Sequence, residues 1–302
     1  MEKTYVFGVD IGGTTVKLGL FTVEGELLKK FEIKTRTENG GENILYDIAS
    51  AIKDTMKEEK IAFENVKGVG VGVPGPVLEN GTVNKCVNLG WGVIKIEEEL
   101  STLLNGILVK AGNDANVAAL GEMWKGGAEG YRNVVMVTLG TGVGGGVIIN
   151  GEIVKGSFGA GGEIGHIEMC EDETETCGCG KKGCLEQYSS ATGIARKAKE
   201  IMGKDLTAKD VLDLAKENDK EAEEVVHFMA KKIGKALSII SCVMDPEIFV
   251  IGGGVSKAGD YLLNMIQGYF MQSAFHASRK AVFALAKLGN DAGIYGAAKL
   301  VL

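Results

Sequence analysis

The fold of this chain is decided by the stretch Tyr5-Val-Phe-Gly-Val-Asp-Ile-Gly-Gly-Thr-Thr-Val-Lys-Leu-Gly-Leu-Phe21. Residues 5–10 are mostly apolar, as in a buried strand, and residues 16–21 alternate like a strand that returns beside it. The Gly-Gly pair between them allows a tight turn, because glycine takes backbone conformations that other residues resist. The sequence therefore predicts a strand, a glycine turn and a second strand.

A similar pattern returns in the second half of the chain. Residues 134–139 form another apolar strand, Gly140-Thr-Gly142 a tight turn, and residues 147–149 a returning strand. We interpret the two copies as a weak internal duplication. Helical periodicity elsewhere, as in residues 44–56, alternates with further strands. The sequence thus predicts two α/β domains with a cleft between them.

The composition argues against several classes of protein. The chain has 302 residues with 45 glycines, three prolines and 45% apolar residues, so it is neither collagen-like nor disordered. A net charge of −7 argues against a general nucleic-acid binder. No apolar run approaches the roughly 20 residues of a membrane span, and no signal-peptide pattern is present, so we expect a cytoplasmic protein. There, six cysteines indicate metal binding or chemistry, not disulfides.

The first candidate site is the turn Asp10-Ile-Gly-Gly-Thr14. Gly12 and Gly13 let the backbone approach an anion closely, and Thr14 adds hydroxyl and N–H donors. Asp10, at the strand end, can hold Mg²⁺ directly or through water. An ordinary glycine hairpin is the alternative, but the flanking residues and the second copy favour a phosphate site.

The second turn, Gly140, Thr141 and Gly142, begins a G-x-G-x-x-G pattern that also occurs in dinucleotide-binding proteins. In those proteins the pattern opens a helix. Here the β-branched residues 147–149 and 153–154 flank an Asn-Gly turn and predict a hairpin. We therefore interpret this turn as a second phosphate site. A P-loop is excluded because the chain contains no G-x-x-x-x-G-K-[ST].

The strongest motif combines His166 with three cysteines, Cys177, Cys179 and Cys184. Three thiolates and one imidazole suit tetrahedral Zn²⁺, and the interleaved glycines let the loop wrap a small ion. Four such ligands within 19 residues favour zinc over a set of free cysteines. Because the protein fills all four positions, we expect the ion to be structural. The other cysteines lack this pattern and are expected in the core or at the surface: Cys86, Cys170 and Cys242.

Three acidic residues are candidates for contact with a substrate. Asp114 stands where a predicted strand, residues 107–111, gives way to a predicted helix, residues 115–125. It is either a general base aimed into the cleft or the N-cap of that helix. Glu163 and Glu186 flank the metal ligands, and converging carboxylates suit sugar hydroxyls. Solvated loop acids are the alternative.

Together these landmarks resemble the ROK family (repressor, open reading frame, kinase) over essentially the whole chain. The zinc signature joined to Glu and His is highly specific, whereas the glycine turns alone are not. The resemblance implies an α/β protein with the actin-like ATPase fold, in which two ribonuclease H-like domains close over ATP and a sugar. The landmarks are Asp10-Ile-Gly-Gly-Thr14, Asn113-Asp114, Gly140-Thr-Gly142, Glu163-x-x-His166, Cys177-x-Cys-Gly-x-x-Gly-Cys184-Leu-Glu186 and Gly252-Gly-Gly254.

The resemblance also implies how the chain is divided. We expect an N-terminal domain of residues 1–118, completed by a final helix at residues 291–302. Residues 119–290 then form the C-terminal domain, with a zinc-binding insert at residues 156–192. The family suggests a homodimer. Its repressors carry a helix-turn-helix ahead of the sugar domain, and the first strand near residue 5 leaves no room for one, so we expect a kinase without a nucleic-acid partner.

Carried over to this sequence, the resemblance assigns roles to the candidate residues. Both glycine turns hold the phosphates of ATP together with Mg²⁺, and Asp114 is the catalytic base. His166 serves twice, with one ring nitrogen on zinc and the other toward the sugar. The adenosine lies beside Gly252, Gly253 and Gly254. The sugar is bound by Asn88, Asn113, Asp114, Glu163, His166 and Glu186.

The implied reaction is the ATP-dependent phosphorylation of the 6-hydroxyl of glucose. The stretch Asn88-Leu-Gly-Trp91 resembles the loop of bacterial glucokinases and favours glucose, while N-acetylmannosamine and fructose stay open. The phosphoryl donor is ATP, or polyphosphate as in some relatives. A non-catalytic sugar sensor is the other alternative. The intact Asp10, Asp114 and glycine turns argue against it, since a pure binder needs no base.

Overall fold

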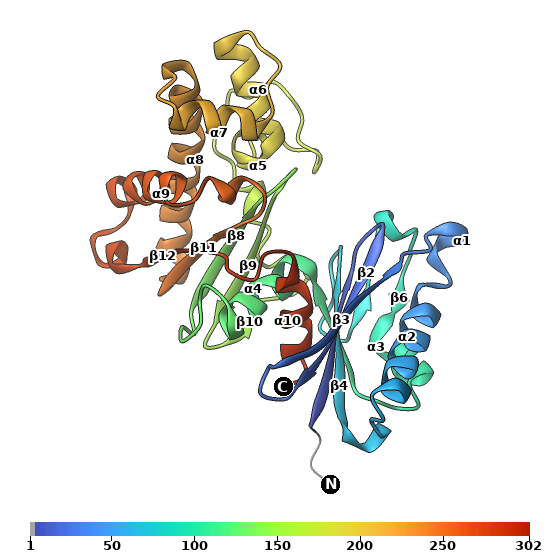
Figure 1. Ribbon diagram of the computed structural model, residues 1–302. Helices are drawn as coiled ribbons and strands as arrows, with labels where there is room; N and C mark the ends of the chain where they lie inside the picture. Colours follow the sequence, from blue (N-terminus) through green and yellow to red (C-terminus); the bar gives the residue numbers. More distant parts are fainter. Residues whose placement is uncertain (1–3) are drawn as a thin grey trace. The chain divides into compact units, whose positions relative to one another are not determined.

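The computed structural model describes residues 4–302, which form two compact units (Figure 1). The first unit consists of residues 4–130, Glu152–Gly161 and Asn290–Leu302. The second consists of Tyr131–Gly151 and Gly162–Gly289. Each unit contains strands and helices, as the predicted α/β class requires.

The first unit is built on a five-stranded sheet. Its order is β3 (Leu27–Lys34), β2 (Thr15–Thr22), β1 (Tyr5–Ile11), β4 (Val66–Val73) and β7 (Val109–Asn113). The β1–β2 pair is the predicted hairpin, and β3 continues it in antiparallel pairing. β4 and β7 run parallel to β1, so the carboxyl ends of these three strands meet at one edge of the sheet.

Helices cover both faces of this sheet. On one face, the apolar side chains of β1 pack with those of α2 (Ile44–Glu58) and α3 (Ile96–Leu103) into one core. On the other face, α10 (Ala292–Lys299) lies against β1 and β4 and packs on α4 (Asp114–Lys125). Gly8 and Gly70 permit this approach, because a Cβ at either position would overlap with a backbone carbonyl of α10. The last helix of the chain thus completes the first unit.

Several short elements precede or connect these parts of the first unit. They are α1 (Glu38–Gly41), β5 (Thr82–Val83) paired with β6 (Ile94–Lys95), and 3-10 turns at Phe63–Asn65, Val87–Leu89 and Gly289–Asp291.

The second sheet contains the other predicted hairpin. Its order is β10 (Glu152–Ile153), β9 (Val143–Ile149), β8 (Val134–Leu139), β11 (Ile248–Gly252) and β12 (Val282–Leu285). β8 and β9 are antiparallel, whereas β8, β11 and β12 are parallel neighbours. The turns that follow β8 and β11 therefore leave the sheet at the same edge.

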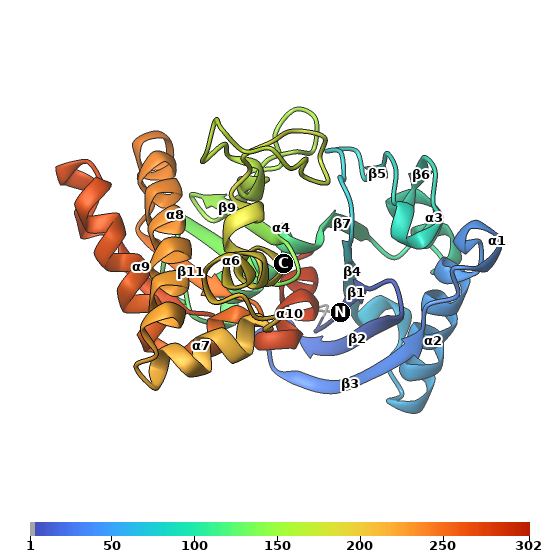
Figure 2. The ribbon, with the colours of Figure 1, turned by 90° about the horizontal axis from the view of Figure 1, so that it is seen from above.

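The helices of the second unit are α5 (Glu186–Ser189), α6 (Ala191–Met202), α7 (Ala208–Lys216), α8 (Lys220–Met244) and α9 (Asp260–Ser273). α8 and α9 pack side by side, and α8 also contacts α6 and α7 (Figures 1 and 2). Short 3-10 turns occur at Ile164–His166, Val255–Ala258 and His276–Lys280. Within residues 4–302 no helix combines the length and the apolar composition that a membrane span needs.

The structure decides between two interpretations of the second glycine turn. β9 begins at Val143, directly after Gly142, and pairs with β8. The dinucleotide-binding alternative requires a helix at that point and is therefore wrong. The final helix, expected at residues 291–302, is shorter and covers Ala292–Lys299.

The boundary between the units differs from the expected division at residue 118. That position lies inside α4, and the whole helix stays with the first unit because it packs against α10. The first unit therefore extends to Gly130. Residues 156–161, the start of the expected zinc-binding insert, also belong to the first unit.

Candidate active site

Asp10 lies at the carboxyl-terminal end of β1, on the face of the sheet that α10 covers. Gly293, in the first turn of α10, packs directly against the Asp10 carboxylate. A Cβ at that position would lie only 2.6 Å from it. Burial raises the pKa of the Asp10 carboxyl, Lys17 lowers it, and the negative charge of Asp114 raises it further. Two carboxylates that disfavour each other's charge suit a divalent cation such as Mg²⁺, which would offset the repulsion.

The first glycine turn is held in shape by backbone and threonine hydrogen bonds. The Gly12 N–H donates to the carbonyl of Thr15 at 3.0 Å and closes the turn. The Thr35 hydroxyl donates to the Gly12 carbonyl at 2.7 Å, and the Thr35 N–H donates to the Thr14 carbonyl at 2.9 Å. Gly13 and Thr14 are exposed. A rigid turn with exposed glycine and threonine is the arrangement expected of an anion site.

Asn88 lies beside this turn. It is an exposed residue of the 3-10 turn Val87–Leu89, and its carbonyl oxygen would lie 3.8 Å from a Cβ added at Gly13. The loop is anchored by Trp91, whose indole N–H donates to the carbonyl of Gly41 at 3.2 Å. The first unit thus brings the predicted sugar residue Asn88 next to the predicted phosphate turn.

Asn113, not Asp114, caps α4. The side-chain oxygen of Asn113 accepts from the N–H groups of Ala115 and Asn116 at 3.1 and 3.2 Å, and its amide donates to the Gly75 carbonyl at 3.3 Å. The N-cap alternative for Asp114 is therefore wrong, since the preceding residue takes that position. Asp114 Oδ1 accepts from the Ala115 N–H at 2.8 Å, which holds the carboxylate at the positive end of the helix dipole.

The second glycine turn is tied to the start of α6. The Gly140 N–H donates to the Gly142 carbonyl at 2.9 Å, and the Ala191 N–H donates to the Gly140 carbonyl at 2.8 Å. The Thr192 hydroxyl donates to the Thr141 carbonyl at 3.2 Å. The turn therefore lies beside the N-terminus of a 12-residue helix, where the dipole favours negative charge.

A pocket of about 510 Å³ opens beside this turn, within the second unit. Gly253 has φ +86° and packs on the backbone of Leu139, which joins the turns after β8 and β11. Gly252 ends β11 in the buried sheet, so among the three predicted adenosine residues only Gly254 lines the pocket. The pocket walls are formed by Gly140, Thr141, Ala191, Thr207, Ala208, Lys209, Leu212, Asp213, Lys216, Gly254, Val255, Lys257 and Ala258.

The residues that α7 contributes to this pocket were not found from the sequence. The motif Thr207-x-x-Asp210 is a capping box, in which each side chain bonds the other residue's backbone N–H. This motif could have marked the start of α7. No local signal places that helix opposite Gly254, because the contact joins segments about 45 residues apart in the chain.

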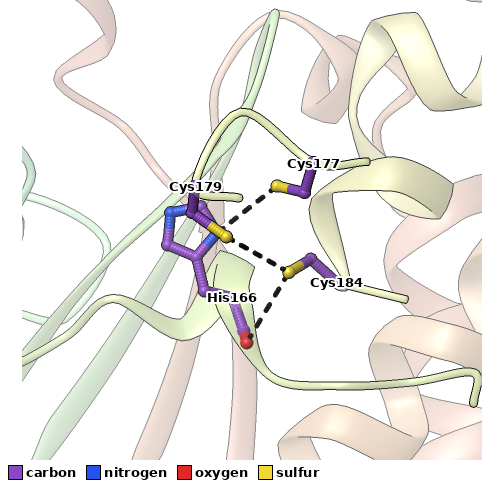
Figure 3. A group of neighbouring side chains, drawn as sticks. All are labelled: His166, Cys177, Cys179 and Cys184. Carbon is purple, nitrogen blue, oxygen red and sulfur yellow. Dashed lines mark hydrogen bonds between the residues drawn. The ribbon is translucent and has the colours of Figure 1, made fainter. Parts of the chain in front are cut away.

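The four predicted zinc ligands form one cluster (Figure 3). Their ligand atoms all lie within 4.8 Å of one another. Cys179 Sγ and Cys184 Sγ are 3.6 Å apart, and Cys177 Sγ and His166 Nδ1 are 3.8 Å apart. Ligands at about 2.3 Å (sulfur) and 2.0 Å (nitrogen) around tetrahedral zinc lie roughly 3.5–3.8 Å from one another, so the donor set and its spacing fit this ion.

The predicted sugar residues of the second unit lie at this cluster: His166 belongs to it, and Glu163 and Glu186 are beside it. His166 Nε2, the ring nitrogen that faces away from Cys177, lies 3.9 Å from Glu163 Oε2. Glu186 Oε1 lies 3.7 Å from Cys177 Sγ, and Glu186 Oε2 accepts from the Val143 N–H at 3.0 Å. Glu163, His166 and Glu186 are thus brought together around the metal cluster.

The remaining cysteines and histidines lie outside the cluster. Cys86 is buried, with its thiol 3.0 Å from the Pro74 carbonyl, Cys170 is half-buried, and Cys242 is exposed. His227 pairs with the Tyr269 hydroxyl at 3.0 Å. None of these residues belongs to the cluster of His166.

Comparison with known proteins identifies the class to which this arrangement belongs. Residues 6–302 match the ROK family, so the chain belongs to that family. The predicted fold class, an α/β protein with the actin-like ATPase (ribonuclease H-like) fold, is confirmed.

Similar proteins include two named sugar kinases and a solved structure. The chain is 41% identical over 317 residues to a glucokinase of Halalkalibacterium halodurans, covering 100% of this chain and 96% of the relative. An N-acetyl-D-glucosamine kinase of Haemophilus influenzae is 31% identical and covers 98% of this chain and 99% of its own. The structure of a ROK family glucokinase from Streptomyces griseus, in complex with glucose and AMPPNP, is 32% identical with a TM-score of 0.75 and 98% coverage of both chains.

Proposed function

We propose that this chain is a glucokinase, which transfers the γ-phosphoryl group of ATP to the 6-hydroxyl of glucose. The observation that carries the proposal is the placement of Asp10 and Asp114 at the carboxyl ends of β1 and β7, close enough for their charges to interact. The full-length similarity to glucokinases supports the same conclusion.

Asp114 is the general base in this proposal. Its carboxylate is fixed by the Ala115 N–H, so it is positioned before the sugar binds. As the 6-hydroxyl attacks the γ-phosphorus, Asp114 accepts the hydroxyl proton. Asn88 and Asn113 bind neighbouring hydroxyls of the sugar. Asn88 lies beside the first glycine turn, and Asn113 lies at the start of α4, next to Asp114.

The two glycine turns bind the phosphates. Gly12, Gly13 and Thr14 in the first unit, and Gly140, Thr141 and Gly142 in the second, present backbone N–H groups to the anion. Mg²⁺ held by Asp10 supplies positive charge to the phosphates when it is bound. The adenosine occupies the 510 Å³ pocket beside Gly254, whose walls also offer Lys209, Lys216 and Lys257. Local donors of this kind let a protein of negative net charge bind a polyanion.

Zinc has a structural role in this proposal. Bound by His166, Cys177, Cys179 and Cys184, it fixes the loop that carries Glu163 and precedes Glu186. His166 uses Nδ1 toward the metal, which leaves Nε2 on the side of Glu163 for a sugar hydroxyl. Glu163, His166 and Glu186 then bind the sugar as preorganised acceptors.

Two finer statements accompany the proposal. We place the enzyme in the cytoplasm, where a thiolate site remains reduced. We also infer a homodimer, which is supported by apolar side chains exposed near the ends of α8 and α9, among them Val243 (79% exposed) and Phe275 (57%). Sedimentation of the purified chain at micromolar concentration tests the assembly; a monomer would contradict it.

The decisive experiment measures ADP release with a range of acceptors. Glucose, N-acetyl-D-glucosamine, N-acetylmannosamine, fructose and allose are compared with ATP, and then polyphosphate replaces ATP. We expect the highest kcat/KM with glucose and ATP. If another hexose is the best substrate, the chain is a kinase of that hexose and not of glucose. If the chain binds sugar without turnover, it is a sugar sensor.

The first mutational prediction concerns the base. Asp114→Asn should lower kcat by about 10²–10⁴-fold while glucose binding is retained, because only the proton acceptor is lost. The matched control is Asp54→Asn, an exposed carboxylate on α2, which should leave kcat unchanged. Equal activity of Asp114→Asn and the wild type would remove Asp114 from its role.

A further inference from the structure

A short loop of the first unit presents an aromatic side chain to solvent. The loop is Lys155-Gly-Ser-Phe-Gly-Ala-Gly161, and Phe158 at its tip is 86% exposed. This is the largest exposed fraction among the large apolar side chains that the structure describes in residues 4–302. An exposed phenylalanine offers an apolar surface that gains free energy when a ligand covers it.

The loop has a defined shape. The Gly161 N–H donates to the Lys155 carbonyl at 2.9 Å and closes its neck. Gly156 and Gly159 flank the tip with φ values of +73° and +72°, a region that favours glycine. Phe158 is therefore held between two glycine bends on a closed loop.

The loop lies beside the residues that are proposed to hold the sugar in this unit. A Cβ added at Gly159 would lie 3.2 Å from the Val77 carbonyl and 3.5 Å from Pro76. The carbonyl of Gly75, two residues before Val77, accepts the side-chain N–H of Asn113. Phe158 thus projects from a loop that packs on the same turn as the sugar residue Asn113.

A buried side chain of α4 fixes the neck of the loop. Asn116 is 3% exposed, and its Nδ2 donates to the Gly161 carbonyl at 3.2 Å. Its Oδ1 has no hydrogen-bond partner among residues 4–302. A buried acceptor without a partner costs free energy, so asparagine at this position needs a reason. The reason is its donor, which links the helix that begins at Asp114 to the loop of Phe158.

We propose that Phe158 covers the apolar face of the acceptor hexose and that Asn116 is a positioning residue which holds the Phe158 loop over it. The inference rests on the proposed function, because the sugar is the occupant. A pyranose ring presents C–H groups on its face, and an aromatic ring that stacks on them loses contact with water. The same stacking would exclude water from the attacking hydroxyl.

The test of Phe158 separates sugar affinity from catalysis. Phe158→Ala should raise KM for glucose about tenfold or more and leave KM for ATP unchanged, because the stacking surface is lost. Phe158→Tyr keeps that surface and should restore KM to within about threefold. The matched control is Phe63→Ala, a 39% exposed phenylalanine at the opposite end of β4, which should change neither constant.

The test of Asn116 is a double-mutant cycle. Asn116→Ala should raise KM for glucose as Phe158→Ala does, and the double variant should be no worse than either alone, because both act through one loop. Additive effects would contradict the positioning role. Gly159→Ala, which strains the loop without touching α4, is measured in case Asn116→Ala does not fold; it should raise KM for glucose in the same way.

The outcomes separate this inference from the proposed function. If the wild type does not phosphorylate glucose, the proposed function fails. If the wild type is active and Phe158→Ala has the glucose KM of Phe63→Ala, the covering role of Phe158 is wrong while the proposed function stands.

Discussion

Glu186 contacts both the second glycine turn and the loop that carries the metal ligands Cys177, Cys179 and Cys184, which we call the metal loop. Its Oε2 accepts from the N–H of Val143, the first residue of β9, and its Oε1 lies 3.7 Å from the sulfur of Cys177. The carboxylate cannot move without losing its contact with Val143 or with Cys177. A Cβ at position 142 would overlap with the same carboxylate, so any side chain there displaces Glu186.

Gly142→Ala should therefore displace Glu186 and the turn together. We expect kcat/KM for both ATP and glucose to fall about 10²-fold, since misplacement of about 1 Å has this effect. Gly268→Ala, in the interior of α9 where an added Cβ meets no atom within 4 Å, is the matched control. It should keep both constants and raise the free energy of unfolding by up to about 1 kcal/mol. Identical kinetics for the two variants would show that Glu186 does not couple the two parts.

At the scale of elements, α6 holds the metal loop through one arginine. Arg196 donates to Glu173 at 2.8 Å and to Glu175 at 2.7 Å, immediately before Cys177. The Tyr188 hydroxyl also donates to Glu173 at 2.7 Å. The loop is therefore ordered by a salt bridge at its start as well as by the metal ligands that follow.

This salt bridge makes stability depend on pH in a defined direction. The hydrogen bond from Arg196 lowers the pKa of the Glu173 carboxyl from 4.5 to about 2. The unfolded chain binds this proton more readily, so the stabilisation is complete above pH 4.5 and is lost as the pH falls toward 2. Glu173→Gln should lower the free energy of unfolding by about 1–3 kcal/mol at neutral pH, because a half-buried partner of Arg196 loses its charge.

Denaturant unfolding of Glu173→Gln and the wild type over a series of pH values checks this prediction. The difference between the two should shrink below pH 4.5 and vanish near pH 2. Glu175→Gln is the matched control, because Glu175 pairs with the same arginine but is 65% exposed. Glu175→Gln should lower the free energy of unfolding by less than about 1 kcal/mol at any pH. A constant difference for Glu173→Gln across the series would contradict the assignment.

The metal cluster is tested at the same scale. Cys179→Ser removes one thiolate, so bound zinc, measured by elemental analysis, should fall well below one ion per chain. The midpoint of thermal unfolding should fall with it, because metal binding and loop folding are coupled. Cys242→Ser, an exposed cysteine outside the cluster, should change neither quantity. Unchanged metal content in Cys179→Ser would refute the site.

At the scale of the whole molecule, the sequence predicted the features that have a local signal and did not predict the packing of distant segments. The Gly-Gly turn between apolar strands and the four ligands within 19 residues identify the first hairpin and the metal cluster. The role of Asp114 stayed undecided between a general base and the N-cap of α4, because an aspartate at a strand end suits both; the cap is Asn113. The pocket wall formed by α7 depends on contacts between distant segments. The family resemblance, not the residue pattern, predicted that the last helix belongs to the first unit.

The strands nevertheless contain a signal for the packing of α10 on the first sheet. Gly8 and Gly70 interrupt otherwise apolar strands, which often marks close approach of another backbone. Both glycines lie under α10. The first unit therefore cannot be complete until the last residues of the chain are in place, since α10 packs on β1, β4 and α4.

Gly70→Ala tests this dependence, because its Cβ would overlap with the carbonyl of Ala297 in α10. We expect the free energy of unfolding to fall by about 3 kcal/mol or more, since neither backbone can yield without undocking the helix. Hydrogen exchange should rise in α10 and α4 while β8 and β11 keep their protection, because those strands belong to the other unit. Gly92→Ala, where an added Cβ meets nothing within 4 Å, is the control. If Gly70→Ala were as stable as Gly92→Ala, the docking of α10 would contribute little to the first unit, and its cohesion would have to come from the core on the other face of the sheet.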